Sequence, residues 1–221
     1  MEIEVLASGS NANCYVLRKG GETLLLECGE RITTTLPKLK YKLPDAILVT
    51  HEHGDHAKSA KNFLERGIPM YMTAGTAEAL NLKRHNMHII QAGEEFKIGS
   101  FAIKALAVKH DAAEPVNYIV DDLLFVTDTG RVPAIEGKSF KQILIETNYS
   151  EAALLDADID ERQRRRILEN HLSVDRAIEF LKDNPASEVH LIHISKRHGD
   201  GAEFRERVIA ETTGIEKVIV D

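Results

Sequence analysis

A segment rich in histidine and acid, THEHGDH, directly follows the apolar run AILV. Its residues His51 and His53 stand two positions apart on what should be extended backbone, so both side chains point to the same side. Gly54 permits a sharp turn, after which Asp55 and His56 can point back into the same space. Imidazole and carboxylate are ligands that zinc, manganese and iron accept. We therefore predict a metal site at the end of a buried strand.

The four donors of this segment cannot all bind one tetrahedral ion that also keeps an open position, so we expect them to divide between two ions. Two ions that share a water lower its pKa, and hydroxide then forms at neutral pH. Such a hydroxide could attack a lactam, a thioester or a phosphodiester. The alternative interpretation, a helix N-cap with surface histidines, does not account for four such residues within six positions.

The composition is that of a globular protein. Of 221 residues, 43% are hydrophobic, which suffices for one sizeable domain with a large core. No apolar run approaches the length of a membrane span and the start MEIEVLASGS does not resemble a signal peptide, so we expect a cytoplasmic protein with no membrane contact. In that compartment Cys14 and Cys28 should be free core residues. The net charge of −7 argues against a protein that binds nucleic acid over its whole surface. It is compatible with a local positive site.

Hydrophobic periodicity divides the chain into alternating strands and helices. The predicted strands cover 3–7, 14–29, 45–50, 69–73, 142–147, 188–195 and 216–220, with hairpins over 88–110 and 116–130. The predicted helices cover 55–67, 75–84, 151–184 with an interruption near NHLS, and 202–214. Hairpin-rich sheets with interspersed helices predict an α/β fold in which two mixed β-sheets are flanked by helices.

Turn and cap residues set the boundaries of these elements. The segment 14–29 should fold back at Gly20-Gly21, and the two later hairpins near Gly93–Glu95 and at Asp121-Asp122. We expect Asp55 to be the N-cap of the helix 55–67 and Gly67 to end it.

The metal motif resembles a known family. THEHGDH matches the His-x-His-x-Asp-His motif of the metallo-β-lactamase superfamily, and further ligands of that family occur in order as His110 in AVKHDAAEP, Asp128 in LLFVTDTG and His193 in VHLIHISKR. The resemblance implies a four-layer αββα sandwich in which residues 1–221 form a single hydrolase domain. The implied ligand sets are His51, His53 and His110 for one ion, Asp55, His56 and His193 for the other, and Asp128 between them.

One residue departs from the family pattern. Where the family places an aspartate after the strand, to orient ligand histidines, this chain has Glu27 in LLLECG. The role could survive with a small backbone adjustment, or Glu27 could be an ordinary acid at a strand end. Carboxylates behind metal ligands change metal affinity by roughly ten- to a hundredfold, so Glu27 bears on occupancy rather than on the fold.

A second pair of residues bears on the substrate class. Glu146 ends the apolar strand ILIE, and His171 precedes a helix start at which Ser173 is a candidate N-cap. This pair resembles the phosphodiesterase branch of the superfamily, notably ribonuclease Z. Cleavage of a phosphodiester expels a poor alkoxide leaving group, to which a histidine oriented by a carboxylate can donate a proton. The alternative interpretation makes His171 a loop residue and Glu146 a solvated strand end.

Four further residues are candidates for substrate contact. The start ASGSNANCYVL resembles that of the YycJ/WalJ-type branch of small nucleases, in which Ser10 and Asn13 would donate to substrate; a plain turn is the alternative. Lys196 and Arg197 follow His193 and could contact a phosphate. The run ERQRRRI, just upstream of His171, fits a solvated helix face better than a phosphate site.

The leading hypothesis is therefore a dinuclear hydrolase that cleaves a nucleic acid or nucleotide-like phosphodiester. Its cofactors would be two divalent ions, zinc in the first place with manganese or iron as alternatives, and its catalytic residues Asp55, His171 and Glu146. A hydrolase of small thioesters or lactones with the same metals is the first alternative. A metal-binding protein without hydrolytic activity is the second.

Overall fold

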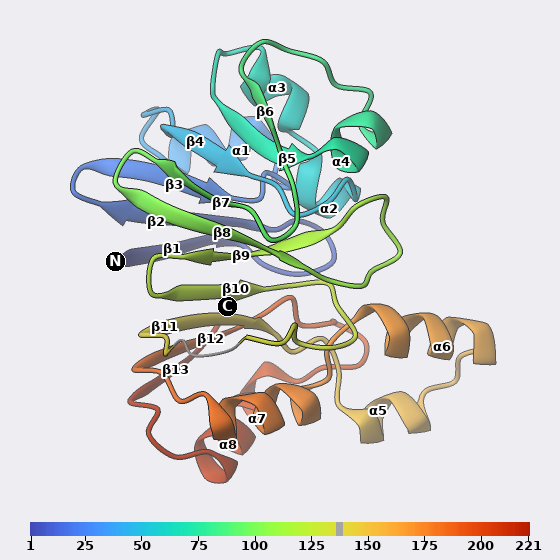
Figure 1. The fold of residues 1–221 in the computed structure, drawn as a ribbon. Helices are drawn as coiled ribbons and strands as arrows, with labels where there is room; N and C mark the ends of the chain where they lie inside the picture. The colour runs from blue at the N-terminus through green and yellow to red at the C-terminus, as the bar shows by residue number, and fades with distance from the viewer. Residues whose placement is uncertain (136–138) are drawn as a thin grey trace. The chain divides into compact units, whose positions relative to one another are not determined.

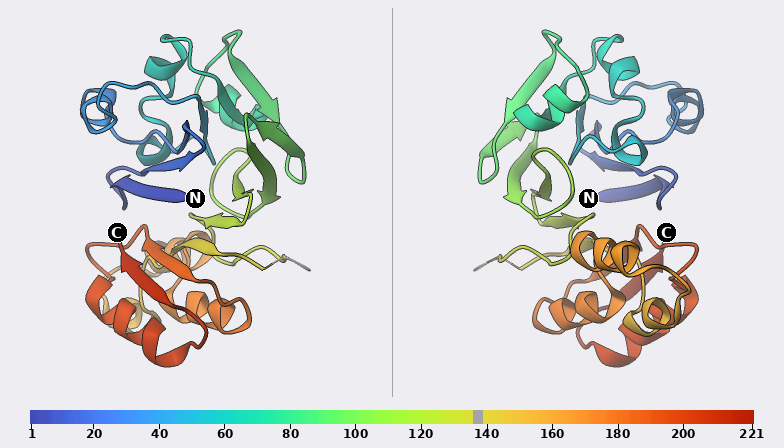
Figure 2. Two further views of the ribbon diagram at one scale, coloured as in Figure 1. Left: turned by 90° about the vertical axis from the view of Figure 1, so that its left-hand side faces the viewer. Right: turned by 90° about the vertical axis from the view of Figure 1, so that its right-hand side faces the viewer.

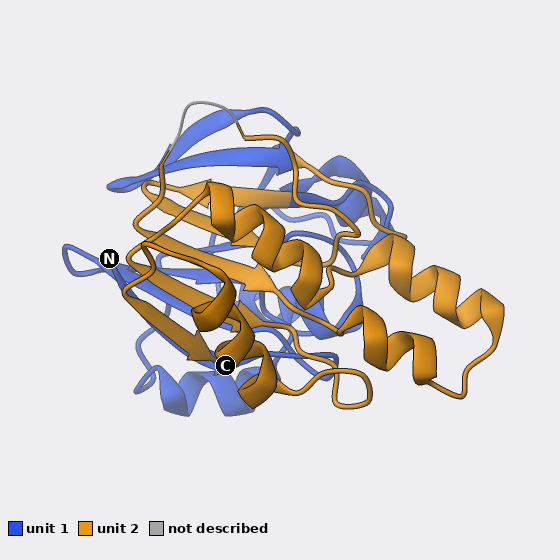
Figure 3. Ribbon diagram, turned by 90° about the horizontal axis from the view of Figure 1, so that it is seen from below, with its two compact units in different colours: residues 1–106, 112–116 blue, residues 107–111, 117–221 orange. Residues whose placement is uncertain are grey.

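The computed structural model describes residues 1–135 and 139–221, which form two compact units. Unit 1 consists of Met1–Leu106 and Ala112–Val116, and unit 2 of Ala107–Asp111 and Asn117–Asp221 (Figure 3). Each unit carries a mixed β-sheet with helices packed on it, so the predicted α/β class with two mixed sheets flanked by helices is confirmed.

The sheet of unit 1 keeps its strands in chain order (Figure 1). Its first three strands pair antiparallel and the rest run parallel. Gly20 and Gly21, with φ of 58° and 89°, form the turn between the second and third strands, which confirms the predicted hairpin. The strands are β1 (Glu2–Ala7), β2 (Cys14–Lys19), β3 (Glu22–Leu26), β4 (Ala46–Leu48), β5 (Met70–Thr73) and β6 (Met87–Ile90).

Short helices cover one face of this sheet and share its core. Val16, Leu25 and Ile47 from the strands pack with Phe63 from a helix and with Met70 in one buried cluster. Cys14 and Cys28 are buried free thiols in the same cluster, as predicted. The helices are α1 (Ile32–Lys38), α2 (Gly54–Ala57), α3 (Ala60–Leu64) and α4 (Ala74–Ala79).

The single helix predicted over 55–67 is wrong, because α2 ends at Ala57 and a new helix begins at Ala60. The predicted N-cap role of Asp55 is also wrong, since His53 occupies that position and Asp55 lies inside α2. Gly67 does adopt a left-handed conformation, with φ of 80°, in the turn after α3.

Hydrogen bonds to the first strands explain the break in this helix. The backbone carbonyls of Asp55 and His56 accept the N–H groups of Asn13 at 2.7 Å and Cys28 at 2.8 Å. The N–H of Ser59, which would bond to Asp55 in a continuous helix, donates to the carbonyl of Cys28 at 2.9 Å. Bonds to the β2–β3 hairpin thus replace helical bonds and fix the histidine-rich loop to the sheet.

The hairpin predicted to turn near Gly93 is wrong. β6 pairs in parallel with β5, and the hairpin that follows joins β7 (Glu95–Ile98) to β8 (Phe101–Ala107) with its turn at Gly99 and Ser100. The carboxylate of Glu22 accepts the Ser100 backbone N–H at 2.8 Å and also bonds its hydroxyl, which anchors this turn to the start of β3.

The sheet of unit 2 orders its strands β13-β12-β11-β10-β9. β9 and β10 pair antiparallel around the turn at Asp121 and Asp122, as predicted, while β10 to β13 run parallel. The strands are β9 (Val116–Val120), β10 (Leu123–Val126), β11 (Gln142–Glu146), β12 (Glu188–Ile192) and β13 (Lys217–Val220).

Capped helices follow the parallel strands of unit 2. Ser173, the predicted cap, accepts the N–H of Arg176 at 3.2 Å, and the predicted interruption near NHLS is present. α7 and α8 pack on β11 to β13, whereas α5 and α6 lie beyond the end of β11 (Figures 1 and 2). The helices are α5 (Glu151–Asp156), α6 (Glu161–Asn170), α7 (Val174–Asp183) and α8 (Gly201–Glu211). Among the described residues, none of the helices has the length and apolar character needed to cross a membrane.

Gly29 is the position at which the histidine-rich loop depends most on backbone packing. A Cβ at Gly29 would lie 1.6 Å from the carbonyl oxygen of Asp55. We expect Gly29→Ala to lower the free energy of unfolding by about 3 kcal/mol, because the loop must move to make room. Urea denaturation measures this loss. Gly54→Ala is the matched control, since a Cβ there meets nothing within 4 Å, and equal stability of the two variants would contradict the account.

Candidate metal centre

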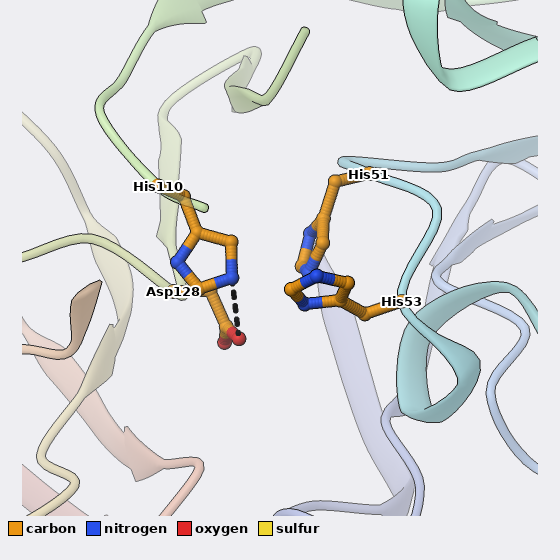
Figure 4. Close-up of side chains that lie close together, drawn as sticks. All are labelled: His51, His53, His110 and Asp128. Carbon is orange, nitrogen blue, oxygen red and sulfur yellow. Dashed lines mark ion pairs between the residues drawn. The ribbon is translucent and has the colours of Figure 1, made fainter. Parts of the chain in front are cut away.

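The histidine-rich segment of unit 1 forms the connection between the buried strand β4 and helix α2. His51 and His56 are 1% and 0% exposed, whereas His53 and Asp55 remain partly exposed. The ring centroid of His51 lies 4.6 Å from that of His53 and 4.2 Å from that of His56, and Figure 4 shows the first pair. Three imidazoles and the carboxylates of Glu52 and Asp55 are therefore gathered in one short loop.

A hydroxyl sets the orientation of the first of these rings. The Oγ1 atom of Thr50 lies 2.8 Å from Nδ1 of His51, in the buried turn after β4. With Nδ1 engaged in this way, Nε2 is the nitrogen through which His51 would bind a metal. The Thr50 hydroxyl, just after β4, thus fixes the orientation of the His51 ring.

Asn13, which we predicted to donate to substrate, is fully buried behind the loop. Its amide nitrogen lies 3.3 Å from Oδ2 of Asp55 and 3.1 Å from Nε2 of His56. Its amide oxygen accepts the N–H of Gly9 and the hydroxyl of Tyr15, both at 3.0 Å. Asn13 therefore positions two predicted ligands, and its contact with substrate stays a prediction.

Glu27 reaches the same loop from the end of β3. It is fully buried with a left-handed backbone (φ 66°), and its two oxygens lie 3.2 Å and 3.4 Å from the backbone nitrogen of Thr50. Oε1 is also 3.6 Å from Nδ1 of His56. Burial raises the pKa of Glu27 more than His56 and Thr50 lower it. Glu27 therefore contacts the histidine-rich loop at Thr50 and His56, and its role in orienting ligand histidines stays a prediction.

The predicted ligands of unit 2 also follow strands. Asp128 comes after β10 and His193 after β12, both with left-handed backbones (φ 43° and 54°), a conformation that non-glycine residues adopt mainly at turns and functional sites. Oδ2 of Asp128 lies 3.5 Å from Nε2 of His110, the contact dashed in Figure 4, and Oδ1 lies 3.1 Å from Nδ1 of His193. The two oxygens of Asp128 therefore face different histidines, and its predicted place between two ions stays a prediction.

Glu146 connects two histidines of unit 2 from a fully buried position. Its Oε1 lies 2.8 Å from Nδ1 of His171 and 2.8 Å from Nδ1 of His193. Its Oε2 accepts the backbone N–H groups of Thr129 at 3.2 Å and Leu172 at 3.1 Å. The contact that we predicted between Glu146 and His171, across 25 residues of sequence, is therefore present.

The charges of this cluster shift its protonation equilibria. Burial favours the neutral acid, yet the nearby His171 and its hydrogen bond hold the pKa of Glu146 below its usual value. Burial likewise opposes the charge of His171, but Glu146 raises the pKa of that imidazole above its usual value. Burial lowers the pKa of His110 more than Asp128 raises it. The pKa values of His171 and His110 are therefore shifted in opposite directions, with the charged form favoured at His171.

The donor chemistry of both units fits divalent metal ions. In unit 2, one ligand atom from each of Asp128, Glu146, His171 and His193 lies within 4.8 Å of the others. In unit 1, the donors are the imidazoles of His51, His53 and His56 and the carboxylate of Asp55. Mixed His/Asp donors suit zinc, manganese and iron alike, so the donor set identifies a class of metal rather than one element.

Two residues that hold the predicted ligands were not found from the sequence. Thr127 donates its hydroxyl to Oδ1 of Asp128 at 2.8 Å. The amide of Asn148 donates to the carbonyl of His193 at 2.9 Å and lies 3.4 Å from its Nδ1. Thr127 directly precedes the predicted ligand Asp128, and Asn148 directly follows the predicted strand 142–147. A polar residue at a strand end is too common, however, to identify either of them from the sequence.

The remaining candidates lie on exposed segments. Ser10 is exposed in the turn after β1, and Lys196 and Arg197 are exposed in the connection from His193 to α8. In α6, the guanidinium of Arg164 donates to the carbonyls of Leu154 and Ala157, which closes the α5–α6 connection. Arg166 pairs with Asp111 at 2.7 Å.

Comparison with known proteins decides the family. A family model described as "Beta-lactamase superfamily domain" matches residues 23–194, a range that contains every predicted metal ligand. The chain belongs to the beta-lactamase superfamily. Its resemblance to the metallo-β-lactamase branch, inferred from the motifs, is thereby confirmed.

Two relatives within this superfamily match most of the chain. The exodeoxyribonuclease WalJ of Streptococcus pneumoniae (serotype 2, strain D39 / NCTC 7466) is 31% identical over 219 residues, covering 88% of this chain and 81% of WalJ. The exodeoxyribonuclease YycJ of Bacillus anthracis is 28% identical over 218 residues, covering 88% and 83%. The crystal structure of YhfI from Bacillus subtilis, a metallo-β-lactamase fold protein, has a TM-score of 0.76 at 17% identity and covers 99% of this chain and 95% of YhfI. This likeness establishes the superfamily fold.

Glu146→Gln tests whether the buried acid holds the histidines of unit 2. The substitution keeps the size of the side chain but removes the charge. It also puts an NH2 donor either at the Oε1 position, where both histidines need an acceptor, or at the Oε2 position, where the N–H groups of Thr129 and Leu172 need one. We expect the free energy of unfolding of the metal-free chain to fall by about 3 kcal/mol, measured by urea denaturation. The exposed Glu179 on α7 provides the control, and Glu179→Gln should change little. A loss no greater than in the control would show that the network contributes no stability.

Proposed function

We propose that this superfamily member is a metal-dependent phosphodiesterase that acts on nucleic acid or a nucleotide-like diester. The observation that carries the proposal is the His171–Glu146 pair, with 2.8 Å between Nδ1 and Oε1, next to the ligand candidates Asp128 and His193. The similarity to two proteins named exodeoxyribonuclease supports the same substrate class.

The proposal includes two divalent ions, zinc in the first place with manganese or iron as alternatives, and residues 1–221 acting as one domain. When bound, such ions supply an activated water and positive charge for the attacked phosphate. The seven proposed ligands are His51, His53, Asp55, His56, His110, Asp128 and His193.

His171 is the proposed general acid. Its side chain is 21% exposed, so substrate can reach it, and its Nδ1 bond to Glu146 leaves Nε2 to donate a proton to the leaving oxygen. Glu146 raises the pKa of His171, which favours the protonated imidazole that an acid requires. Glu146 acts through His171 by fixing its tautomer and stabilising its charge.

Asp55 is the second proposed catalytic carboxylate. It is partly exposed, and Asn13 holds its Oδ2 at 3.3 Å, so it is oriented to accept a proton from the attacking water. Lys196, Arg197 and Ser10 are proposed to contact the substrate phosphates from their exposed segments. A cytoplasmic location is part of the proposal, supported by the free thiols of Cys14 and Cys28.

Comparison of two phosphodiesters tests the acid role. We expect His171→Ala to lower kcat/KM on a single-stranded oligonucleotide by about 100-fold or more, because its alkoxide leaving group needs a proton. On bis(p-nitrophenyl) phosphate the loss should be less than about tenfold, because p-nitrophenolate leaves unaided. His85→Ala, in an exposed turn, is the matched control and should behave as wild type on both. Equal losses on the two diesters would exclude His171 as the acid.

Parallel assays of a thioester and a lactam test the alternatives. Turnover of the thioester without either phosphodiester would replace the proposal with a small-molecule hydrolase. A metal-loaded chain that turns over none of the four substrates would favour a metal-binding protein without hydrolytic activity.

A further inference from the structure

A groove of about 550 Å³ lies on unit 1, between the α2–α3 segment and the connection from α4 to β6. Its lining includes four cationic side chains, Lys58, Lys61, Lys83 and Arg84. Against these four, the described lining residues include one carboxylate, that of Glu52. The sequence did not reveal this cluster, because its cations come from two segments that are separated by a strand and a helix.

The cations of the groove are only partly neutralised. Lys58 donates to the carbonyl of Asn11 at 3.1 Å, and Arg84 lies 3.3 Å from the carboxylate of Glu65. Within residues 1–135 and 139–221, neither Lys61 nor Lys83 has a carboxylate partner within 4 Å. In a chain of net charge −7, this surplus of positive charge favours an anionic ligand at this place.

The groove borders the histidine-rich loop. Glu52 and Gly54 line it, and they alternate along the chain with His51, His53 and Asp55. Oε1 of Glu52 accepts the N–H of Ala113 at 2.8 Å, which directs part of that carboxylate to the 112–116 segment. The groove is therefore bordered by the same loop that carries the proposed ligands.

The arrangement of the cations indicates a linear polyanion rather than one small anion. Three of the four are exposed lysines, which act as separate point charges, and they stand on two different segments. The groove is also far larger than a single phosphate group. None of the described residues that line it has an aromatic side chain on which a base could stack, so recognition would depend on charge and not on base identity.

We propose that this groove binds the sugar-phosphate backbone of a single nucleic-acid strand and leads it to the histidine-rich loop. The inference rests on the proposed phosphodiesterase function and adds the surface that holds the substrate outside the reacting centre. Lys61 and Lys83 contribute most, because their charges are not already used within the chain.

Salt-dependent binding of the full chain tests the groove. Fluorescence anisotropy with nuclease-resistant phosphorothioate oligodeoxythymidylate and oligouridylate compares wild type with the double variant K61Q/K83Q. Loss of two phosphate contacts should reduce the slope of log K against log salt by about 1.4 and weaken binding about twentyfold near 0.1 M salt. The same loss on both oligomers assigns the groove to the shared phosphate backbone, and a loss on one of them assigns it to that nucleic acid.

The control K40Q/K97Q removes the same charge from exposed lysines of unit 1 outside the groove and should bind as wild type. Equal weakening in both double variants, unchanged binding by K61Q/K83Q, or full displacement of the oligomers by inorganic phosphate would each overturn the proposal. Binding requires no turnover, so a chain that hydrolyses no phosphodiester would refute the proposed function while this comparison still decides the groove.

Discussion

The shared contact of Glu146 with two histidines is the interaction on which the proposed chemistry of unit 2 depends. A fully buried carboxylate is tolerated only when charge and hydrogen bonds compensate its loss of water, and here His171, His193 and two backbone N–H groups do so. Because Glu146 ends β11 and its partners follow β10, β12 and α6, the contact ties the ends of several elements together. It also gives one imidazole a raised pKa and a fixed tautomer, which an acid catalyst needs.

Polar residues with a left-handed backbone follow strands in both units. Glu27 and His193 directly follow β3 and β12, and Asp128 lies two residues after β10. All three have a left-handed backbone, which turns the side chain away from the direction that a strand would give it. Buried hydrogen bonds then hold these residues in place. The Thr50 backbone N–H donates to the carboxylate of Glu27, and the Thr127 hydroxyl donates to that of Asp128. The Asn148 amide donates to the backbone carbonyl of His193. Rigid, buried strands thus position polar groups that loops alone would leave mobile.

Much of this was predictable because it depends on local pattern. The ligand motif, the Gly20-Gly21 and Asp121-Asp122 turns and the Ser173 cap all follow from residue types at fixed spacing. The break in the helix after Gly54 was not predictable, because it depends on carbonyl bonds to Asn13 and Cys28 of the first hairpin. The inward-facing amide of Asn13 and the parallel pairing of β6 with β5 likewise depend on tertiary contacts. The basic groove combines residues from separate segments, and only the fold brings these together.

The central claim is that the histidine and aspartate donors of this chain bind two divalent ions. Elemental analysis of the full chain, reconstituted with zinc and then dialysed against metal-free buffer, tests this claim most directly. The account predicts close to two ions retained per chain. A chain that retains one ion or none, while still folded, would contradict it.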